Sequence, residues 1–593
     1  MLTQKEPCEL GIAMQARRAW REDERASHAM RIIWTLLLNL WVLLRWPWLA
    51  MRRARAAPTG AWLAIVIDGP VVEIGRRQPW WGQRPRTVSL HAIRDVVALA
   101  REDSNVRGVL VTIRHLRGGS AIATSVRQAL VETRTAGKRL VAYLPDGAGT
   151  RELLVASAAD SVIAGPQTVI SALGYALEVQ HVKQALDRVG VEAEVIARGR
   201  YKTAAEFLTS PAMSDAQREQ LEATLDTCFD ELVRALSEGR KRDAETVRRW
   251  VDEGPWTADD AREHGIIDDI AYPDELARKL DPSSERGASM VPAGRYRSRR
   301  RIRWRSLVRK PIVAVVQVHG AIVSRDDDQM LPVADAEAIC DVLDAVRDDR
   351  NVAGVIVHVN SRGGSAVASD RILRAMRRVR ERKPVIACLG DVAASGGYMV
   401  AVGADAILAQ PTTITGSIGV IGVRLVMGEL MRKIGVTTSV VKRGERADMM
   451  TVTRHLSAGE RGAWDRHIDQ TYRAFLEAVA QGRGRAVDSI EPLAGGRVWS
   501  GKHAVERGLV DELGGFEAAL ARMKERLGAV GEVAEPMVVG GRSMLDMLSM
   551  LLIASPAAAG WLRGAGVTDL AWLAAGNERD RVLAWCEVVE QAR

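Results

Sequence analysis

A serine in the second half of this sequence has the neighbours that a nucleophile needs. Residues 390–398 read GDVAASGGY, so small residues precede Ser395 and two glycines follow it. This composition allows a sharp bend from a strand into a helix, which exposes the hydroxyl and places backbone N–H groups beside it. A serine hydroxyl is a weak nucleophile near neutral pH and needs a base within hydrogen-bond reach. Ser395 is therefore a candidate nucleophile whose base must be found elsewhere in the chain.

An internal repeat points to this base. The pentapeptide RGGSA occupies residues 117–121 and recurs at 362–366, a spacing of 245. The same spacing relates VASAADSVIAGP to VAVGADAILAQP. A unit this long is a duplicated domain, because solenoid repeats run to about 20 to 50 residues.

The two copies differ at positions that could do chemistry. The equivalent pairs are Ser395 and Thr150, Lys202 and Ala447, and Ser417 and Ala172. The amine thus lies in one copy and the hydroxyls lie in the other. The most economical interpretation is one composite active site, built either within a chain or between neighbouring subunits.

Lysine can serve as the base when it is neutral. Its reference pKa of about 10.4 must fall to roughly 7 to 8, which burial in an apolar pocket achieves by disfavouring the ammonium form. Ser417 is placed to orient the amine. A histidine base is the competing idea, but the ten histidines are scattered and none lies between Ser395 and His455. We interpret His358, beside the glycine loop, as a strand residue.

The repeated Gly-Gly pair supplies donors for an oxyanion. In NSRGGS, residues 360–365, two glycines follow an apolar run and let backbone N–H groups point at one spot. Gly363, Gly364 and Gly396 are the candidates. A tight turn that packs a helix onto a sheet is the alternative, because Gly118–Gly119 persists in the copy without the serine.

Apolar runs and helical patterns alternate in both copies and indicate how these residues are positioned. Residues 63–67, 109–113, 313–318 and 355–359 are almost continuously apolar, as in parallel strands that are buried on both faces. Helical patterns such as 334–346 and 369–379 intervene. The order predicts a duplicated α/β fold with right-handed crossovers.

The N-terminal region contains one candidate membrane segment. Residues 32–44 are almost wholly apolar, and Arg45, Trp46 and Trp48 follow. An uncleaved spanning anchor, an interfacial helix and a buried or targeting helix all remain open. More basic residues precede the segment than follow it, which favours a cytoplasmic N-terminus with the bulk of the chain outside.

Composition argues against a nucleic-acid-binding protein, a disulfide framework and a metal site built from cysteines. The net charge of +9 is a mild excess, and no zinc-finger spacing, basic heptad or aromatic RNA-binding strand accompanies it, so we expect no nucleic acid partner. The five cysteines are far apart and odd in number, which fits neither a disulfide framework nor a metal site.

These motifs resemble the long form of signal peptide peptidase A, over about residues 60 to 530. The residues that carry the resemblance are YKTA at 201–204, NSxGGS at 360–365, AASGGY at 393–398 and TGSIG at 415–419. The resemblance implies tandem Clp/crotonase-like domains, no cofactor or metal, and degradation of cleaved signal peptides and other apolar peptides. It also implies a homo-oligomer, with a tetramer favoured, at the inner membrane with periplasmic or extracytoplasmic catalytic domains.

The predicted organisation follows from the repeat and the anchor. The segments are a basic N-terminal segment (1–29), a membrane anchor (30–53), a lysine-bearing domain (58–275), a basic linker (276–310), a serine-bearing domain (311–533) and a C-terminal tail (534–593). Two other functions stay open: an inactive membrane scaffold of the same fold, and a crotonase-like acyl-CoA enzyme that holds a thioester in its Gly-Gly loop.

Overall fold

The computed structural model describes residue 33 and residues 35–74, 87–301, 311–325, 333–528, 534–539 and 582–584. The predicted basic segment 1–29, the start of the predicted anchor and most of the predicted C-terminal tail lie outside the described residues.

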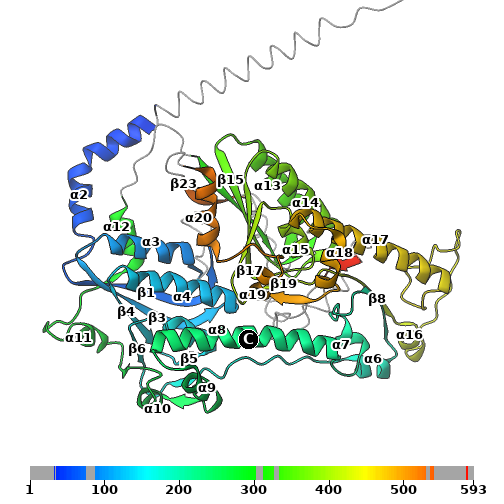
Figure 1. The fold of residues 1–593 in the computed structure, drawn as a ribbon, viewed down its shortest axis with the longest axis horizontal. Coiled ribbons are helices and arrows are strands. Elements are labelled where there is room, and N and C mark those ends of the chain that lie inside the picture. The colour runs from blue at the N-terminus through cyan, green and yellow to red at the C-terminus, as the bar shows by residue number, and fades with distance from the viewer. Residues whose placement is uncertain are drawn as a thin grey trace, which may run out of the picture.

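The N-terminal half is built on a parallel sheet in the order β10-β6-β4-β3-β1-β11, with β2 beside β1 (Figure 1). Its strands are β1 (Ala61–Val72), β2 (Val88–Ser89), β3 (Val106–Arg117), β4 (Arg139–Leu144), β6 (Ser161–Ala164), β10 (Asp269–Ile270) and β11 (Met290–Pro292). Both faces of this sheet are covered. Leu63 and Ile65 of β1 join one apolar cluster and Trp62 joins another, which explains the continuous apolar run.

The C-terminal half repeats this order. Strands β22, β18, β17, β15, β12 and β23 follow one another as their counterparts do in the first half, and β19 and β21 extend the sheet beyond β17. The bounds are β12 (Ile312–His319), β15 (Val352–Ser361), β17 (Val385–Ala394), β18 (Ala406–Ala409), β19 (Ile414–Gly416), β21 (Val498–Ser500), β22 (Glu512–Leu513) and β23 (Ala534–Val539). The predicted α/β duplication is confirmed.

Helices cover both sheets. In the first half they are α3 (Leu90–Arg101), α4 (Ser120–Thr135), α5 (Thr150–Ala156), α6 (Lys183–Val189), α7 (Glu206–Thr209), α8 (Asp215–Arg240), α9 (Ala244–Asp252) and α10 (Ala258–Glu263). In the second half they are α13 (Ala336–Asp348), α14 (Ala366–Arg380), α15 (Gly396–Ala401), α16 (Gly428–Lys433), α17 (Ala458–Arg483), α18 (Val487–Ile490), α19 (Gly501–Glu506) and α20 (Phe516–Leu527).

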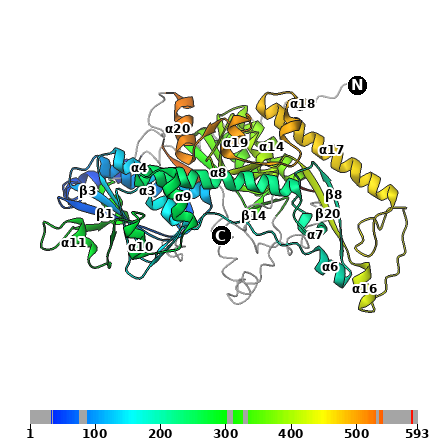
Figure 2. The same ribbon diagram turned by 60° about the horizontal axis from the view of Figure 1, so that its bottom comes forward.

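Two elements tie the halves together. Helix α8 runs along both halves (Figure 2), and its Thr227 hydroxyl donates to Ser500 Oγ of the second half at 3.2 Å. A mixed sheet in the order β14-β13-β16-β24-β20-β8 combines β8 of the first half with strands of the second. Its strands are β8 (Glu192–Arg198), β13 (Ala321–Val323), β14 (Val333–Asp335), β16 (Gly364–Ser365), β20 (Val420–Val426) and β24 (Val582–Ala584), and a smaller sheet joins β5 (Ala148–Gly149), β7 (Val169–Ser171) and β9 (Trp256–Thr257).

The N-terminal unit extends further than its predicted end at residue 275. Residues 276–301, expected to begin the linker, form α11 (Leu276–Leu280), β11 and α12 (Ala293–Arg300). Tyr296 of α12 is fully buried, because its ring is part of the first apolar cluster. Its hydroxyl donates to Leu99 O at 3.1 Å. The segment between the units is thus shorter than predicted. At the other end, β23 pairs with β12, so the predicted tail begins as part of the second sheet.

Part of the predicted anchor is described. Residues 35–44 and α2 (Trp46–Ala54) are helical, and the Arg45 guanidinium lies 4.4 Å from the Trp41 ring centroid and 4.5 Å from that of Trp48. Within the described ranges, none of the helices combines the length and apolar character required to cross a membrane.

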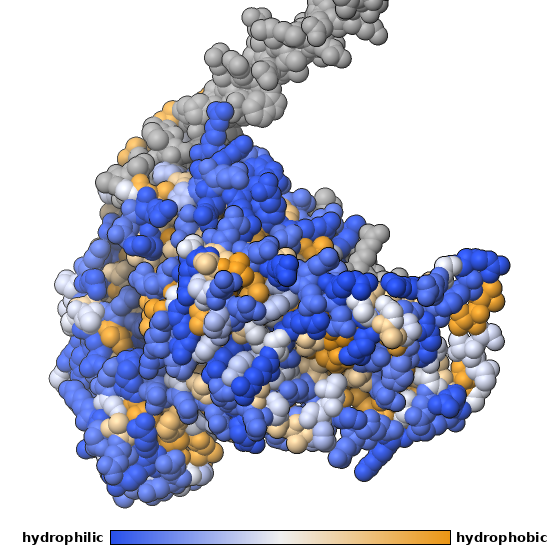
Figure 3. Space-filling model, turned by 45° about the vertical axis from the view of Figure 1, so that its right-hand side comes forward, coloured by the Kyte–Doolittle hydropathy of each residue, from blue (hydrophilic) through white to orange (hydrophobic). Residues whose placement is uncertain are grey.

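An arm projects from the second half (Figures 1 and 2), formed by β20, α16 and the loop that leads to α17. Apolar surface lies at the tip of this arm amid hydrophilic surface (Figure 3). In the chain between β20 and α17, Val441 is 91% exposed and Ile434 is also exposed.

Candidate active site

Ser395 lies in a sharp turn between β17 and α15. Its backbone has φ 56° and ψ −120°, a conformation that non-glycine residues rarely adopt and that the surrounding structure must enforce. The Ser395 N–H donates to Gly416 O of the neighbouring strand at 2.8 Å. A Cβ at Gly397 would lie 2.6 Å from Ser361 O, and one at Gly396 would lie 2.3 Å from Ser369 Oγ. The two glycines are therefore required by close approach to the glycine loop and its helix.

Lys202 reaches the same turn from the first half. Strand β8 pairs antiparallel with β20 over seven residues and ends at Arg198, four residues before the lysine. A glycine pair of the second half holds this segment. Tyr201 N–H donates to Gly495 O at 2.8 Å, and a Cβ at Gly496 would lie 2.5 Å from Lys202 N. The backbone of the lysine thus rests directly on the other half.

Gln220 of α8 holds the residues on either side of the lysine. Its amide nitrogen donates to Thr203 Oγ1 at 2.8 Å and to Tyr201 O at 3.3 Å, while its oxygen accepts from Val498 N–H at 3.2 Å. The side chain is buried, so this one amide links α8, the lysine segment and β21.

The structure brings the three predicted polar side chains together within one chain. Lys202 Nζ lies 2.7 Å from Ser395 Oγ, 3.0 Å from Ser417 Oγ and 3.0 Å from Ser417 O. The three residues are buried, with relative exposures of 5% for Lys202, 0% for Ser395 and 2% for Ser417. An amine that is dry and in contact with a serine hydroxyl is suited to remove the hydroxyl proton.

The three predicted oxyanion donors differ in their surroundings. The Gly363 N–H already donates to Ser361 Oγ at 3.1 Å. Gly396 is the first residue of α15, where N–H groups have no acceptor within the helix. A Cβ at Gly396 would lie 3.4 Å from Gly364 N, so the glycine loop and the start of α15 are adjacent. Gly364 and Gly396 therefore lie next to each other, and Gly364 also pairs with Ile322 of β13 and Ala584 of β24.

His358 takes no part in this cluster. It lies in β15, and its Nδ1 is 2.7 Å from His319 Nε2. Burial, with a smaller effect of His319, lowers the pKa of His358 to about 3 and keeps the ring neutral. Its place in a buried strand agrees with the interpretation from the sequence.

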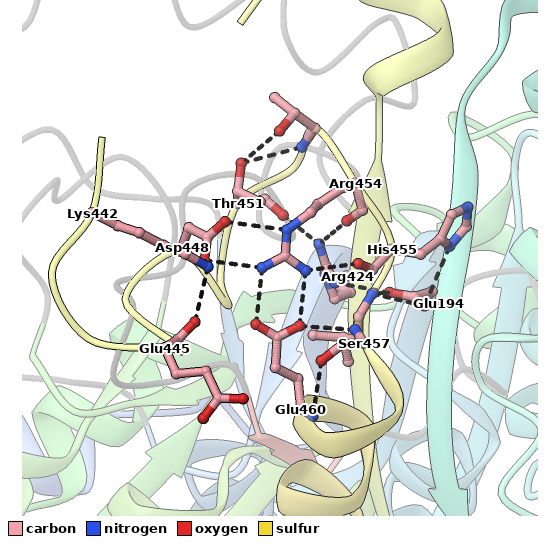
Figure 4. Close-up of polar contacts among 12 residues, drawn as sticks. Glu194, Arg424, Lys442, Glu445, Asp448, Thr451, Arg454, His455, Ser457 and Glu460 are labelled. Carbon is pink, nitrogen blue, oxygen red and sulfur yellow. Dashed lines mark hydrogen bonds and ion pairs between the residues drawn. The ribbon is translucent and has the colours of Figure 1, made fainter. Parts of the chain in front are cut away.

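An ionic network fixes the ribbon formed by β8 and β20 (Figure 4). Arg424 of β20 is 4% exposed in its side chain and donates to Glu194 Oε2 of β8 at 2.8 Å. Its guanidinium also donates to Arg454 O at 2.7 Å and to Thr451 O. Arg454 in turn pairs with Glu460 at 2.8 Å. The network attaches the long loop before α17 to this ribbon. Lys202 follows β8 in the chain, and Ser417 precedes β20.

Reasoning from the sequence missed Gly495, Gly496, Gln220 and Arg424. The glycine pair had a comparable signal. In this region the spacing between the copies is 243, as between Trp256 and Trp499, and the equivalents of Gly495 and Gly496 are Asp252 and Glu253. Gln220 and Arg424 had no such signal, since their roles depend on contacts between segments far apart in the chain.

The chain matches known proteins over most of its length. The model of Peptidase family S49 matches residues 132–285 and again residues 377–530. The chloroplastic serine protease SPPA of Arabidopsis thaliana is 28% identical over 82% of this chain and 71% of its own length. Protease 4 of Haemophilus influenzae is 29% identical over 74% of this chain and 73% of its own.

Shorter proteins match one part of the chain. A putative signal peptide peptidase SppA of Enterococcus faecium is 37% identical over 31% of this chain and 54% of its own length. Among solved structures, a point mutant of ClpP1 from Listeria monocytogenes matches over 35% of this chain and 94% of its own, at 16% identity and a TM-score of 0.23.

Proposed function

Because this chain belongs to peptidase family S49, we propose that it is a serine endopeptidase with a serine–lysine dyad, in which Ser395 is the nucleophile and Lys202 the general base. The observation that carries the proposal is the 2.7 Å contact between the lysine amine and the serine hydroxyl in a buried site. A crotonase-like acyl-CoA enzyme has no use for this contact, and neither has an inactive scaffold.

The mechanism follows from the contacts. The neutral amine of Lys202 takes the Ser395 proton as Oγ attacks the peptide carbonyl, and Ser417 holds the amine in line. The N–H groups of Gly364 and Gly396 stabilise the negative oxygen of the tetrahedral intermediate. The ammonium then protonates the leaving amine, and a water activated by the same lysine releases the acyl group.

An extended peptide is the substrate that fits the surrounding strands. Strand β24 pairs antiparallel with both β16 and β20, so a short extended segment finds backbone partners on two sides beside Gly364. Peptides that add a strand to a sheet are recognised through their backbone, with side-chain pockets giving preference. A match named signal peptide peptidase supports released signal peptides and other apolar peptides as the class.

Attachment to the membrane surface is part of the proposal. Leu40, Trp41 and Leu44 are exposed on the helical segment 35–44, and Arg45 stacks on tryptophan rings as at a membrane interface. The excess of arginine before this segment favours catalytic domains on the extracytoplasmic side of the inner membrane.

Assembly into a homo-oligomer is supported by the repeat. Within the chain, β8 pairs with β20, and their equivalents in the other copies are residues 437–443 and 175–181. Neither of these segments pairs as a strand within the described part of the chain. Pairing of 437–443 with 175–181 of the next subunit would repeat the internal contact head to tail, and such a contact forms a ring when the rotation between subunits closes. We favour a tetramer.

The decisive experiment is covalent labelling of the purified full-length protein with a fluorophosphonate. We expect labelling at Ser395, and loss of labelling and of hydrolysis of an apolar peptide in Ser395→Ala and Lys202→Ala. Thr150→Ala is the matched control, because Thr150 is the equivalent residue and its hydroxyl donates to Gly174 O at 3.0 Å. Undiminished hydrolysis in Ser395→Ala, with no label in the wild type, would refute the proposal.

A further inference from the structure

The strand that delivers Ser395 is interrupted just before the nucleophile. Leu389 of β17 lies opposite Val359 of β15, but the next pair is Ala393 with Ser361, so β17 contains extra residues at this point. Asn360 Oδ1 accepts from Val392 N–H at 3.1 Å where the ladder is broken. A bulge of this kind re-aims the residues that follow it. The direction of the nucleophile turn therefore depends on what fixes the bulge.

Asp391 projects from this bulge into the first half. Its Oδ2 accepts from Gly119 N–H at 2.7 Å, and its Oδ1 accepts from Ile122 N–H at 3.0 Å. These donors lie at the N-terminus of α4, where unpaired N–H groups and the helix dipole favour an anion. A Cβ at Gly119 would lie 2.5 Å from Asp391 Cγ, so only glycine leaves room for the carboxylate.

The loop that receives Asp391 is the first copy's version of the proposed oxyanion loop. Gly119 is the equivalent of Gly364, and Arg151 stands where the second copy has Gly396. Arg151 Nη1 donates to Gly118 O, within the same loop. The first copy has Thr150 in place of the nucleophile, yet an N–H of its Gly-Gly loop still donates to a carboxyl oxygen.

We propose that Asp391 is a positioning residue for the nucleophile, held in the Gly118–Gly119 loop of the first copy, so that the inactive half aims the serine of the active half. This inference rests on the proposed peptidase function. The carboxylate lies on β17, four residues before Ser395, and two hydrogen bonds from backbone N–H groups hold it to the half that also supplies Lys202. These hydrogen bonds thereby fix the position of the nucleophile relative to its base.

The test compares Asp391→Ala, Asp391→Asn and Gly119→Ala in the full-length chain, with active sites titrated by a fluorophosphonate so that kcat refers to competent sites. A misplaced nucleophile slows the chemical step. We therefore expect kcat per site to fall about tenfold in Asp391→Ala, with KM within about twofold of the wild type. Asp391→Asn keeps one acceptor, so its kcat per site is expected to lie between those of Asp391→Ala and the wild type. Gly119→Ala displaces the carboxylate and should give no further loss when combined with Asp391→Ala.

Asp405→Ala is the matched control. Asp405 Oδ2 accepts from Val385 N–H at 2.8 Å at the far end of β17, so its loss weakens the same strand without touching the bulge. We expect reduced thermal stability and an unchanged kcat per site. If Asp391→Ala behaves as Asp405→Ala does, the inference is overturned while the peptidase proposal stands. If the wild type neither labels nor hydrolyses peptide, the peptidase proposal fails and takes the inference with it.

Discussion

Ser417 is the residue that decides where the lysine amine points. Both its hydroxyl and its carbonyl lie 3.0 Å from Lys202 Nζ, and its own backbone sits at a positive φ of 50° that places them there. Ser417→Ala keeps the carbonyl contact and removes the hydroxyl. We expect kcat per titrated site to fall about tenfold with little change in KM, because the amine is less well aligned in the transition state.

The control for Ser417→Ala is Ser157→Ala, which removes the hydroxyl of another fully buried serine, in the first half. Steady-state kinetics on a soluble apolar peptide measure both variants. An equal fall of kcat in both variants would show that the effect comes from general destabilisation of the fold. An unchanged kcat in Ser417→Ala would show that the Ser417 hydroxyl has no role in the mechanism.

Glu73 gives the molecule a pH-dependent stability. Burial, opposed by Arg94 and reinforced by Asp391, raises the pKa of Glu73 from 4.5 to about 7. A carboxyl with a raised pKa in the folded state stabilises the fold when protonated, and that contribution disappears as the pH rises through about 7. Glu73→Gln mimics the protonated form. We expect it to be more stable than the wild type at pH 8, by about 3 kcal/mol at most, and no more stable at pH 4.

Thermal unfolding of Glu73→Gln and of the wild type between pH 4 and pH 8 measures this difference. Glu102→Gln, at the exposed C-cap of α3, is the control for the change of a carboxyl to an amide. A constant gap between Glu73→Gln and the wild type would show that the carboxyl does not titrate in this range.

At the scale of elements, the ribbon of β8 and β20 is the part on which the site depends most. Lys202 follows β8 and Ser417 precedes β20 at the same end of the ribbon, and the buried pair of Glu194 and Arg424 holds its two strands in register. Arg424→Met removes the most buried partner of Glu194, a change that costs about 3 to 5 kcal/mol when no other partner remains. The cost here is smaller, because Glu194 keeps the Leu456 N–H and His455. We expect faster amide exchange in the ribbon and in the loop before α17, together with a lower kcat.

Lys442→Met is the matched control for Arg424→Met. Lys442 pairs with Asp448 at 2.7 Å in the same network, but the Lys442 side chain is 41% exposed and Asp448 keeps Arg454 as a second partner, so the loss of Lys442 should cost under about 1 kcal/mol. Hydrogen exchange read by mass spectrometry distinguishes the two. Equal exchange in both variants would mean that the buried pair does not hold the ribbon.

The sequence was informative where the two copies could be compared and weak where contacts join distant segments. Ser395, Lys202 and Ser417 were found because each differs from its equivalent, and the structure brings them together. The parallel sheets followed from continuous apolar runs. Residues 276–301 were misjudged because eight arginines and lysines between 278 and 301 concealed Tyr296, whose burial fixes α12 to the first half. Asp391 gave no signal, because its partner is a loop 269 to 272 residues away.

At the scale of the whole molecule, the duplication predicts how subunits meet. Val441 of the exposed segment 437–443 and Leu177 of the segment 175–181 are equivalents of Ile196 and Gly422, which pair within the chain. We therefore expect Val441→Asp and Leu177→Asp each to reduce the assembled mass measured by light scattering. Tyr272→Asp, at an apolar residue exposed elsewhere, should leave the mass unchanged. An assembly that survives both changes would exclude this contact.

A mixing experiment tests whether each site is complete within one chain. Lys202 and Ser395 of the same chain lie in contact, so chains that carry Lys202→Ala cannot rescue chains that carry Ser395→Ala, even inside one particle. Co-expression of the two variants with different tags, followed by purification on both tags, gives mixed particles in which we expect no fluorophosphonate labelling and no hydrolysis. Mixed particles of wild-type chains with chains that carry both substitutions are the control, and they should retain activity in proportion to their wild-type content. Recovery of activity in the first mixture would mean that the lysine crosses to a neighbouring subunit, and that the strand β8 which carries it is exchanged between chains.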